Sequence, residues 1–358
     1  MTIREVKVSE LLEFVESEQF MHFDIKPVSV LRAISQFNNP AAFSNDIALV
    51  YIADGNQMLA FAGLLPDRLT DQTALSCNTG WWVAPGRNYL ALPVFLKALE
   101  KCGNLMFFTD CSTHTKSILE KTGLFEFQPE IKGKRFFLRS CFGPVLRRKK
   151  KNKMLVMLAG LADLAFNLLF NFLTYSLWRR IRREGFSIQE VTELDSAIDE
   201  FIAANTGDHV LAQSTQKMNW ILKNPWIKTG AAVDDSAYPF SNNVDSFSQQ
   251  FMVIKRQNEI VAVFIINIIN GMASIPYIFF RKQNLTEISN QIRLFLKLKN
   301  AESLAVFNED LQNAISGNGI PVLFAKRISR FAGFSLPLKE KFSKNRYFQD
   351  GDGDVAFT

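Results

Sequence analysis

The sequence predicts an α+β protein in which a mixed β-sheet is covered by helices. It also predicts two similar halves that are joined by one apolar helix. Of the 358 residues, 47% are apolar and 21% are charged, which is the balance of a globular protein with a buried core. The same order of helices and strands is predicted twice, on either side of an apolar stretch between two basic blocks. We therefore expect three parts, 1–146, 147–183 and 184–358.

Both halves begin alike. Ile3–Val6 reads IREV, Ile188–Val191 reads IQEV, and a helical pattern of apolar residues follows each of them. A second helix is predicted in each half, within 29–40 and within 217–226. Each of these helices ends where an asparagine precedes a proline, because the residue before proline disfavours helical backbone.

Strands follow in both halves. In 48–65 two apolar runs flank Asp54-Gly55-Asn56, which is a strong signal for a tight hairpin turn, and 251–269 turns at Arg256-Gln257-Asn258. A third strand, an amphipathic helix, a short strand, a further helix and a last strand complete each half. The predicted order is α, α, β, β, β, α, β, α, β in both halves, and this agreement indicates a duplicated fold.

The positive charge of the chain is local. Ten of the 41 lysines and arginines lie in the two basic blocks, and the remaining 31 are outnumbered by 35 acidic residues. Such a distribution favours a local anionic partner, either lipid headgroups or a polyphosphate, and argues against a DNA-binding face. Four cysteines without a CxxC pair and three scattered histidines give neither a zinc pattern nor a disulfide framework. We therefore expect no metal, a cytoplasmic location and no secretion signal.

The element order and one segment of the first half resemble the GNAT superfamily, the acyl-CoA-dependent N-acyltransferases. Val83-Ala84-Pro85 matches the Val-x-Pro with which the fourth strand of that family often ends. The family continues with a phosphate loop of the form Arg/Gln-x-x-Gly-x-Gly/Ala. Residues 88–93 read NYLALP, with Asn, Ala and Pro at the three key positions. The resemblance covers most of both halves, and it implies two tandem GNAT-like domains, the first of which binds acetyl-CoA or another acyl-CoA.

The resemblance also implies where the cofactor binds. The pyrophosphate is expected at backbone N–H groups of the loop, with the side chain of Arg87 as its charge partner. Strand residues Trp82 and Val83 are expected beside the cofactor, and an exposed loop arginine is the alternative interpretation of Arg87. Trp81 and Trp82 should point to opposite faces of their strand. The loop residues concerned are Arg87, Asn88, Tyr89, Leu90, Ala91 and Leu92.

The candidate catalytic residues follow the fifth predicted strand, near where a thioester would lie. They are Asp110, Ser112 and His114, and His114 could act as a general base because imidazole titrates near neutral pH. The alternative is a helix start, in which Ser112 or Thr113 caps the helix and His114 is exposed. Cys111 is interpreted as a buried apolar residue, since no histidine is fixed beside it.

A second family signature is altered in both halves. Ser112 precedes Gly123 by 11 residues, and Asn308 precedes Gly319 by the same number. The tyrosine that often protonates the leaving thiolate in GNAT enzymes falls on Leu119 and on the equivalent position of the second half, Ile315. The resemblance therefore implies the fold more directly than it implies catalysis.

The central segment 147–183 has two open interpretations. Met154–Trp178 is long enough to span a bilayer, but Asp163, Asn167 and Asn171 form one polar stripe at four-residue spacing. Both ends are similarly basic, which gives no positive-inside asymmetry. The helix either lies in a membrane interface with its basic ends on anionic headgroups, or packs between the domains with its stripe bonded to protein.

Three functions remain open at this stage. The first is an acyltransferase that modifies an amine or hydroxyl of a small molecule, such as a lipid-linked sugar or another cell-envelope precursor, at the cytoplasmic membrane face. The second is a non-catalytic GNAT-fold binding protein, favoured by the altered loop and the missing tyrosines. The third is an aminoacyl-tRNA-dependent transferase, for which the basic linker is the cue.

Overall fold

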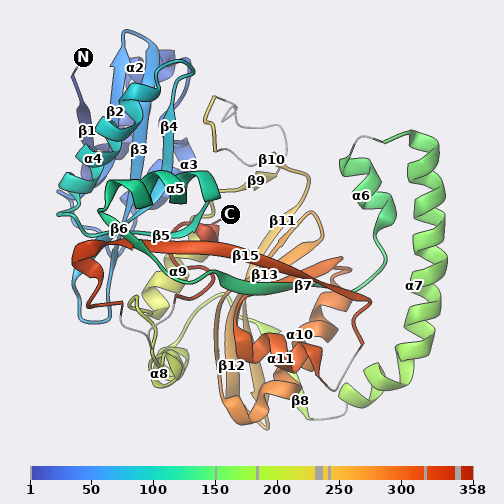
Figure 1. Ribbon diagram of the computed structural model, residues 1–358. Coiled ribbons are helices and arrows are strands. Elements are labelled where there is room, and N and C mark those ends of the chain that lie inside the picture. The colour runs from blue at the N-terminus through green and yellow to red at the C-terminus, as the bar shows by residue number, and fades with distance from the viewer. Residues whose placement is uncertain are drawn as a thin grey trace. The chain divides into compact units, whose positions relative to one another are not determined.

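The computed structural model describes residues 2–149, 151–182, 185–229, 237–240, 243–317, 321–342 and 348–357. The chain is a mixed α/β protein, as predicted (Figure 1). It divides into two compact units. Unit 1 comprises Met1–Ile131, Glu193–Phe247 and Arg330–Thr358, and unit 2 comprises Lys132–Thr192 and Ser248–Ser329. Each unit contains segments from both predicted halves, and the division at 146/147 and 183/184 stays a prediction about the organisation of the sequence.

Unit 1 is built on a sheet with the strand order β1-β2-β3-β4-β5-β15, and β6 also pairs with β15. Strands β4 and β5 are parallel, and the other recorded pairs are antiparallel. The strands are β1 (Arg4–Lys7), β2 (Ile47–Asp54), β3 (Gln57–Arg68), β4 (Ala74–Val83), β5 (Met106–Cys111), β6 (Phe125–Phe127) and the second half of β15 (Phe324–Ser335). The predicted hairpin turn between β2 and β3 is confirmed, with Gly55 in left-handed backbone at φ +55°.

Helices cover both faces of this sheet. One core cluster joins the sheet to α4 and α5, and another joins it to the helices near the N-terminus. Trp81 packs against the first cluster and Trp82 against the second, which confirms that they point to opposite faces. The helical segments of unit 1 are η1 (Val8–Glu10), α1 (Leu11–Glu16), α2 (Glu18–His22), α3 (Val30–Phe37), η2 (Asn88–Leu90), α4 (Ala91–Lys101), α5 (Thr113–Thr122), α8 (Ser196–Asn205), α9 (Thr215–Lys223), η4 (Leu336–Leu338) and η5 (Val355–Phe357).

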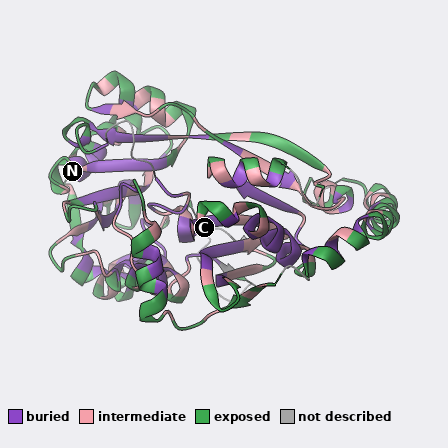
Figure 2. Cartoon of the chain, turned by 90° about the horizontal axis from the view of Figure 1, so that it is seen from below, coloured by how far each residue is buried: buried purple, intermediate pink, exposed green. Residues whose placement is uncertain are grey.

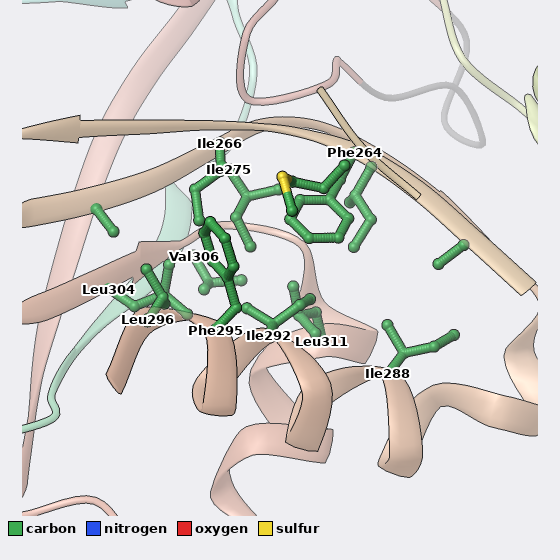
Figure 3. Close-up of a cluster of buried hydrophobic side chains, with 14 of the residues drawn as sticks. Phe264, Ile266, Ile275, Ile288, Ile292, Phe295, Leu296, Leu304, Val306 and Leu311 are labelled. Carbon is green, nitrogen blue, oxygen red and sulfur yellow. The ribbon is translucent and has the colours of Figure 1, made fainter. Parts of the chain in front are cut away.

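Unit 2 has a sheet with the order β7-β14-β13-β12-β11-β8, in which β13 and β14 are parallel. Its strands are β7 (Ile131–Phe137), β8 (Phe186–Glu190), β11 (Phe247–Arg256), β12 (Glu259–Ile269), β13 (Met272–Phe280) and β14 (Ser303–Val306); the short pair β9 (Lys228–Thr229) and β10 (Asn243–Val244) belongs to unit 1. Its helical segments are α6 (Phe142–Arg148), α7 (Lys153–Ile181), η3 (Lys282–Asn284), α10 (Leu285–Leu298) and α11 (Glu309–Ser316). Figure 3 shows apolar side chains of α10 and α11 packed against β12–β14.

The strand beside the short parallel strand comes from the other half of the chain in both units. In unit 1, Gly333 and Phe334 of β15 pair with Phe108 and Phe107 of β5. In unit 2, β7 pairs with β14, from Lys134↔Val306 to Phe137↔Ser303. Strands such as β7 and β15 can hydrogen-bond to the unpaired N–H and C=O groups of any free sheet edge. A local pattern in the sequence therefore does not predict which edge they join.

The two units repeat one irregularity, which supports the predicted duplication. In unit 1, Gly63 of β3 pairs with Gly80 of β4, but the next residue, Leu64, pairs with Asn78. Thr79 is therefore an extra residue on β4. In unit 2, Ile265 of β12 pairs with Tyr277 of β13, and Asn267 pairs with Ser274. The second strand, β13, therefore also has one extra residue. Gly123 ends α5 at φ +68°, whereas its predicted counterpart Gly319 and the following Ile320 lie outside the described residues.

Candidate functional site

Strands β4 and β5 of unit 1 separate soon after they meet. They pair at Ser76↔Met106 and Cys77↔Phe107, and within the described residues no strand lies beside the rest of β4 on that side. The bulge at Thr79 falls just beyond the last pair. Because buried backbone N–H and C=O groups require partners, this edge of β4 can accept a ligand or a side chain.

A cavity of about 560 Å³ lies where the two strands diverge. Its size is in the range of sites for small molecules and cofactors. It is lined by Arg32, Asn78, Thr79, Gly80, Trp81, Phe108, Asp110, Cys111, Ser112, Thr115, Pro239, Phe240 and Asp354. All of these residues belong to unit 1, so the cavity lies within that unit.

Arg32 is the central cation of this cavity. Helix α3 carries it, and Ser29 caps that helix by accepting the Arg32 N–H. The guanidinium Nη1 donates to the carbonyl oxygen of Thr79 at 2.9 Å and lies 4.0 Å from Oδ2 of Asp354. The centre of the Trp226 ring lies 4.2 Å from the guanidinium carbon. Although only 5% of Arg32 is exposed, it is held by a hydrogen bond, a carboxylate and an aromatic face.

Two carboxyl groups face this cavity. Burial raises the pKa of Asp354 to about 6, and the nearby charge of Arg32 partly opposes the shift. Burial also raises the pKa of Asp110, opposed by the charge of Arg330. A carboxyl group with a pKa near 6 is ionised at neutral pH and still basic enough to accept a proton, so Asp354 has the properties of a general base.

The segment DGDGD (350–354) forms turns. Its three aspartates have three different partners. Asp350 forms an ion pair with Arg330, and Asp354 lies beside Arg32. Asp352 accepts hydrogen bonds from Gln213 Nε2 at 3.0 Å and from the Gln349 N–H at 2.7 Å. The carboxylates therefore do not converge on one point, and no group of three metal-ligating side chains occurs among the described residues.

The predicted catalytic residues are only partly brought together. Asp110 and Ser112 line the cavity, whereas His114 is exposed on the first turn of α5 and does not line it. Ser112 Oγ accepts the Thr115 N–H at 3.0 Å, so it is the helix cap of the alternative interpretation. Burial raises the pKa of Cys111 to about 11, which keeps the thiol neutral. The roles assigned to Asp110, Ser112 and His114 stay predictions.

The predicted phosphate loop is a turn followed by a helix start. Gly86 adopts φ +78°, the η2 turn covers Asn88–Leu90, and α4 begins at Ala91 without a side-chain cap. Asn88 and Tyr89 are exposed, and Arg87 donates to the Tyr89 hydroxyl at 3.3 Å. The N–H groups of Leu90 and Ala91 are bonded to the carbonyl oxygens of Arg87 and Asn88, and Pro93 has no N–H, so this helix start offers an anion fewer donors than an open one would.

The remaining cofactor predictions are placed as follows. Leu90 is buried in the core, and Ala91 accepts the indole N–H of Trp81 on its carbonyl oxygen at 3.0 Å. Leu92 is 39% exposed, and Val83 is the last residue of β4. Trp82 stacks on Phe61 with ring centroids 5.6 Å apart and does not line the cavity. Cofactor binding by these residues stays a prediction.

Sequence reasoning did not find Arg32, Asn78, Phe240 or Asp354. The only local signal was the acidic repeat near the C-terminus, where alternate glycines allow the chain to turn tightly. Arg32 and Phe240 carry no such signal, because their importance arises from contacts with residues far away in the sequence.

Comparisons with known proteins agree in fold. No model of a known protein family matches the chain, and no curated protein matches its sequence. A GCN5-related glucosamine N-acetyltransferase region of a fungal multi-domain GH3 β-N-acetylglucosaminidase superimposes with a TM-score of 0.50 at 9% identity, over 93% of this chain and 38% of that one. A probable N-acyltransferase from Enterococcus faecalis V583 gives 0.49 at 11% identity, over 96% of this chain and 74% of that one. A GCN5-related N-acetyltransferase from Anabaena variabilis ATCC 29413 gives 0.48 at 8% identity, over 93% and 72%. The chain has a GNAT fold, as the resemblance implied.

Proposed function

We propose that this GNAT-fold chain is an acyltransferase that uses acyl-CoA to acylate an amine or hydroxyl acceptor in the cavity of unit 1. The observation that carries the proposal is the divergence of β4 from β5 after Cys77↔Phe107, with the bulge at Thr79 and a cavity of about 560 Å³ beside it. An extended acyl-pantetheine chain can pair with the free edge of β4 as an added strand would.

The cofactor would enter from the phosphate loop. The start of α4 lacks a side-chain cap and follows a turn that carries Arg87, so the pyrophosphate would meet backbone N–H groups and one guanidinium. Trp81 connects the cavity with the phosphate loop. It lines the cavity, and its indole N–H donates to the carbonyl oxygen of Ala91 in the first turn of α4. The thioester would then lie near Asp110 and Asp354.

Asp354 is the residue that we assign as general base. Its carboxylate accepts a proton from the acceptor amine or hydroxyl, whose N or O atom attacks the thioester carbonyl. A C–N or C–O bond forms, the C–S bond breaks, and the CoA thiolate takes up a proton as it leaves. Arg32 keeps Asp354 largely ionised at neutral pH and holds the carbonyl of the Thr79 bulge, so it acts as a positioning residue.

The finer features of the proposal come from the sequence. We propose that the acceptor is a sugar or another cell-envelope precursor, such as a lipid-linked sugar. The proposed location of the protein is the cytoplasmic face of a membrane. The support is α7, a long apolar helix with basic residues at both ends. Transfer from aminoacyl-tRNA stays a hypothesis that an RNA-binding assay separates from the other two.

A second candidate function is binding of acyl-CoA without transfer. One observation favours it: the positions at which the family often carries a tyrosine are occupied by Leu119 and Ile315, which are 0% and 2% exposed. These side chains belong to the cores of their units and cannot protonate a thiolate. Under this alternative, acyl-CoA binds but no acyl group is transferred to any acceptor.

Isothermal titration of the purified chain with acetyl-CoA and longer acyl-CoAs tests the proposal. We expect micromolar binding, weakened at least tenfold by Arg87→Glu, because a guanidinium near a pyrophosphate is replaced by a carboxylate. Lys121→Glu is the matched control, since it makes the same charge reversal at an exposed position of α5 away from the loop. No binding up to millimolar acyl-CoA contradicts both functions, whereas binding without thiol release across an amine and hydroxyl panel supports the second.

A further inference from the structure

Helix α7 turns polar side chains toward the protein and apolar side chains away from it, which is the reverse of an ordinary amphipathic helix at a protein surface. Asp163 accepts hydrogen bonds from the N–H of Phe142 at 3.0 Å and from the N–H of Gly143 at 2.7 Å, and also from the Ser140 hydroxyl. Asn167 accepts from the Ser140 N–H at 2.8 Å and donates to the Ser140 carbonyl at 3.0 Å. These bonds fix the rotation of α7 about its axis, because any other rotation would leave a carboxylate and an amide without partners.

Most of the remaining surface of α7 is exposed (Figure 2), and apart from Asn171 its middle part is largely apolar. Twelve large side chains on it are between 48% and 79% exposed. We call these residues the apolar face: Met154, Leu155, Met157, Leu158, Leu161, Leu164, Phe166, Leu168, Leu169, Phe172, Leu173 and Tyr175. Soluble monomers rarely expose a continuous apolar patch of this kind, so the face requires a partner.

Basic residues flank the apolar face at both ends. Eight of them are described: Arg147, Arg148, Lys149, Lys151, Lys153, Arg179, Arg180 and Arg182. Among these eight, the only ion pair within the described chain joins Arg148 to Glu302 at 2.6 Å. A second protein would need acidic groups at two places roughly 40 Å apart, the length of a 29-residue helix. An anionic bilayer provides negative charge along the whole helix and apolar chains below it.

Length and hydropathy alone would allow α7 to cross a membrane. The polar stripe argues against crossing, because Asp163 and Asn167 are bonded to residues 140–143, which are the end of the link between β7 and α6 and the first turn of α6. Crossing would carry this non-helical link into hydrocarbon, where backbone groups cannot find water. A helix that lies flat leaves the link on the water side.

A cationic pocket of about 260 Å³ opens beside α7, between that helix, α10 and the end of β7. Arg139, Arg293 and Lys297 line it together with Asn167, Asn171 and Trp178, and no Asp or Glu is among the described lining residues. Lys297 Nζ lies 4.3 Å from the centre of the Trp178 ring. Burial lowers the pKa of Lys297, and the nearby charge of Arg182 lowers it further. Arg293 donates to the Ser289 carbonyl oxygen at 3.3 Å and to Asn290 Oδ1 at 2.7 Å, so the cations that the pocket offers to a ligand are Arg139 and Lys297. Two neighbouring cations favour an anion with several oxygen atoms.

We propose that unit 2 docks on an anionic bilayer through the apolar face of α7, and that the pocket between α7 and α10 receives the phosphate of a phospholipid headgroup. The acyl chains of that lipid would lie against the apolar face while its phosphate meets Arg139 and Lys297. This inference does not rest on the proposed acyl transfer, because no residue of the unit 1 cavity takes part in it.

Flotation of the full chain with vesicles tests the docking. We expect it to float with vesicles of phosphatidylcholine and phosphatidylglycerol at 7:3, and to bind vesicles of phosphatidylcholine alone at least tenfold more weakly in 150 mM NaCl. Leu168→Glu with Phe172→Glu should reduce flotation at least tenfold. Met21→Glu is the matched control, because Met21 is a similarly exposed apolar residue (68%) of unit 1. A thermal melt confirms that each variant is folded.

Failure of the wild type to float with anionic vesicles overturns the docking proposal, as does flotation of the Leu168/Phe172 variant at the wild-type level. The same holds if light scattering without lipid shows a dimer that this variant dissociates, since a second copy would then cover the face.

Arg139→Gln with Lys297→Gln tests the pocket. We expect the preference for anionic over neutral vesicles to fall at least fivefold. An unchanged preference overturns the headgroup site, and so does complete displacement from vesicles by 10 mM inorganic phosphate at constant ionic strength.

Discussion

Arg32 Nη1 donates a hydrogen bond of 2.9 Å to the backbone carbonyl of Thr79, and this contact ties helix α3 to the bulge of β4. It joins residues that are 47 positions apart in the sequence. The same guanidinium lies 4.0 Å from Asp354 and stacks on Trp226. The contact therefore holds together the backbone, the carboxyl group and the aromatic wall of the proposed active site.

Replacement of Arg32 should damage stability and ligand binding together. Arg32→Ala removes a charged hydrogen bond and leaves Asp354 without its cation, so we expect the free energy of unfolding to fall by about 2 to 3 kcal/mol. Acyl-CoA affinity should fall at least tenfold. Urea denaturation and isothermal titration measure the two effects. Arg4→Ala, an exposed arginine of the same unit, should change stability by less than about 0.5 kcal/mol. Equal effects of the two variants would show that the contact is dispensable.

The acidic limb of the pH profile should identify Asp354 as the base. Its raised pKa of about 6 means that the carboxylate is lost as the pH falls through 6, so kcat/KM should rise with pH in that range. Asp354→Asn should remove this limb and most of the activity. Asp110→Asn, in the same cavity, should keep a limb near pH 6. If Asp354→Asn retains that limb, another group is the base.

The buried ion pair of Lys217 and Asp67 should be a main contact of α9 with the sheet of unit 1. Lys217 Nζ lies 2.9 and 3.2 Å from the two carboxylate oxygens, and both side chains are less than 10% exposed. Lys217→Met leaves a buried carboxylate uncompensated and should cost about 3 to 5 kcal/mol in urea denaturation. The double variant Lys217→Met, Asp67→Leu should recover more than half of that loss. Additive losses in the double variant would mean that the two residues do not act as a pair.

Stability should also depend on His209 below neutral pH. Burial lowers the pKa of this imidazole to about 4, well below its ordinary value of 6.5. The unfolded chain therefore binds a proton that the folded chain rejects, and stability present above pH 6.5 is lost as the pH falls toward 4. The expected loss between pH 7 and pH 5 is about 2 kcal/mol.

The variant His209→Gln isolates this effect, since the other titrating groups are common to both proteins. The difference in unfolding free energy between variant and wild type should change by about 2 kcal/mol between pH 7 and pH 5, in favour of the variant at pH 5. A constant difference over this range would show that His209 does not titrate differently in the folded and unfolded chains. Urea denaturation at several pH values provides the measurement.

The sequence predicted those parts of the site that depend on local patterns. Val83-Ala84-Pro85 located the end of β4, and the polar residues at the end of β5 and just after it included Asp110 and Ser112, which do line the cavity. Its alternative for Ser112, a helix cap, is what the structure shows. Arg32 and Asp354 could not be predicted, because each owes its role to a partner that is distant in the sequence.

By itself, the sequence determined the local elements and their order. The turn at Gly55, the cap at Ser29 and the long apolar helix α7 follow from the conformational preferences of a few neighbouring residues, so they can be read from short segments. Only the tertiary structure decided which edges β7 and β15 join, which way the polar stripe of α7 faces, and that Arg32 meets Asp354. These features depend on burial and hydrogen bonding between segments up to several hundred residues apart, and the free energies that select them exist only once those segments are packed together.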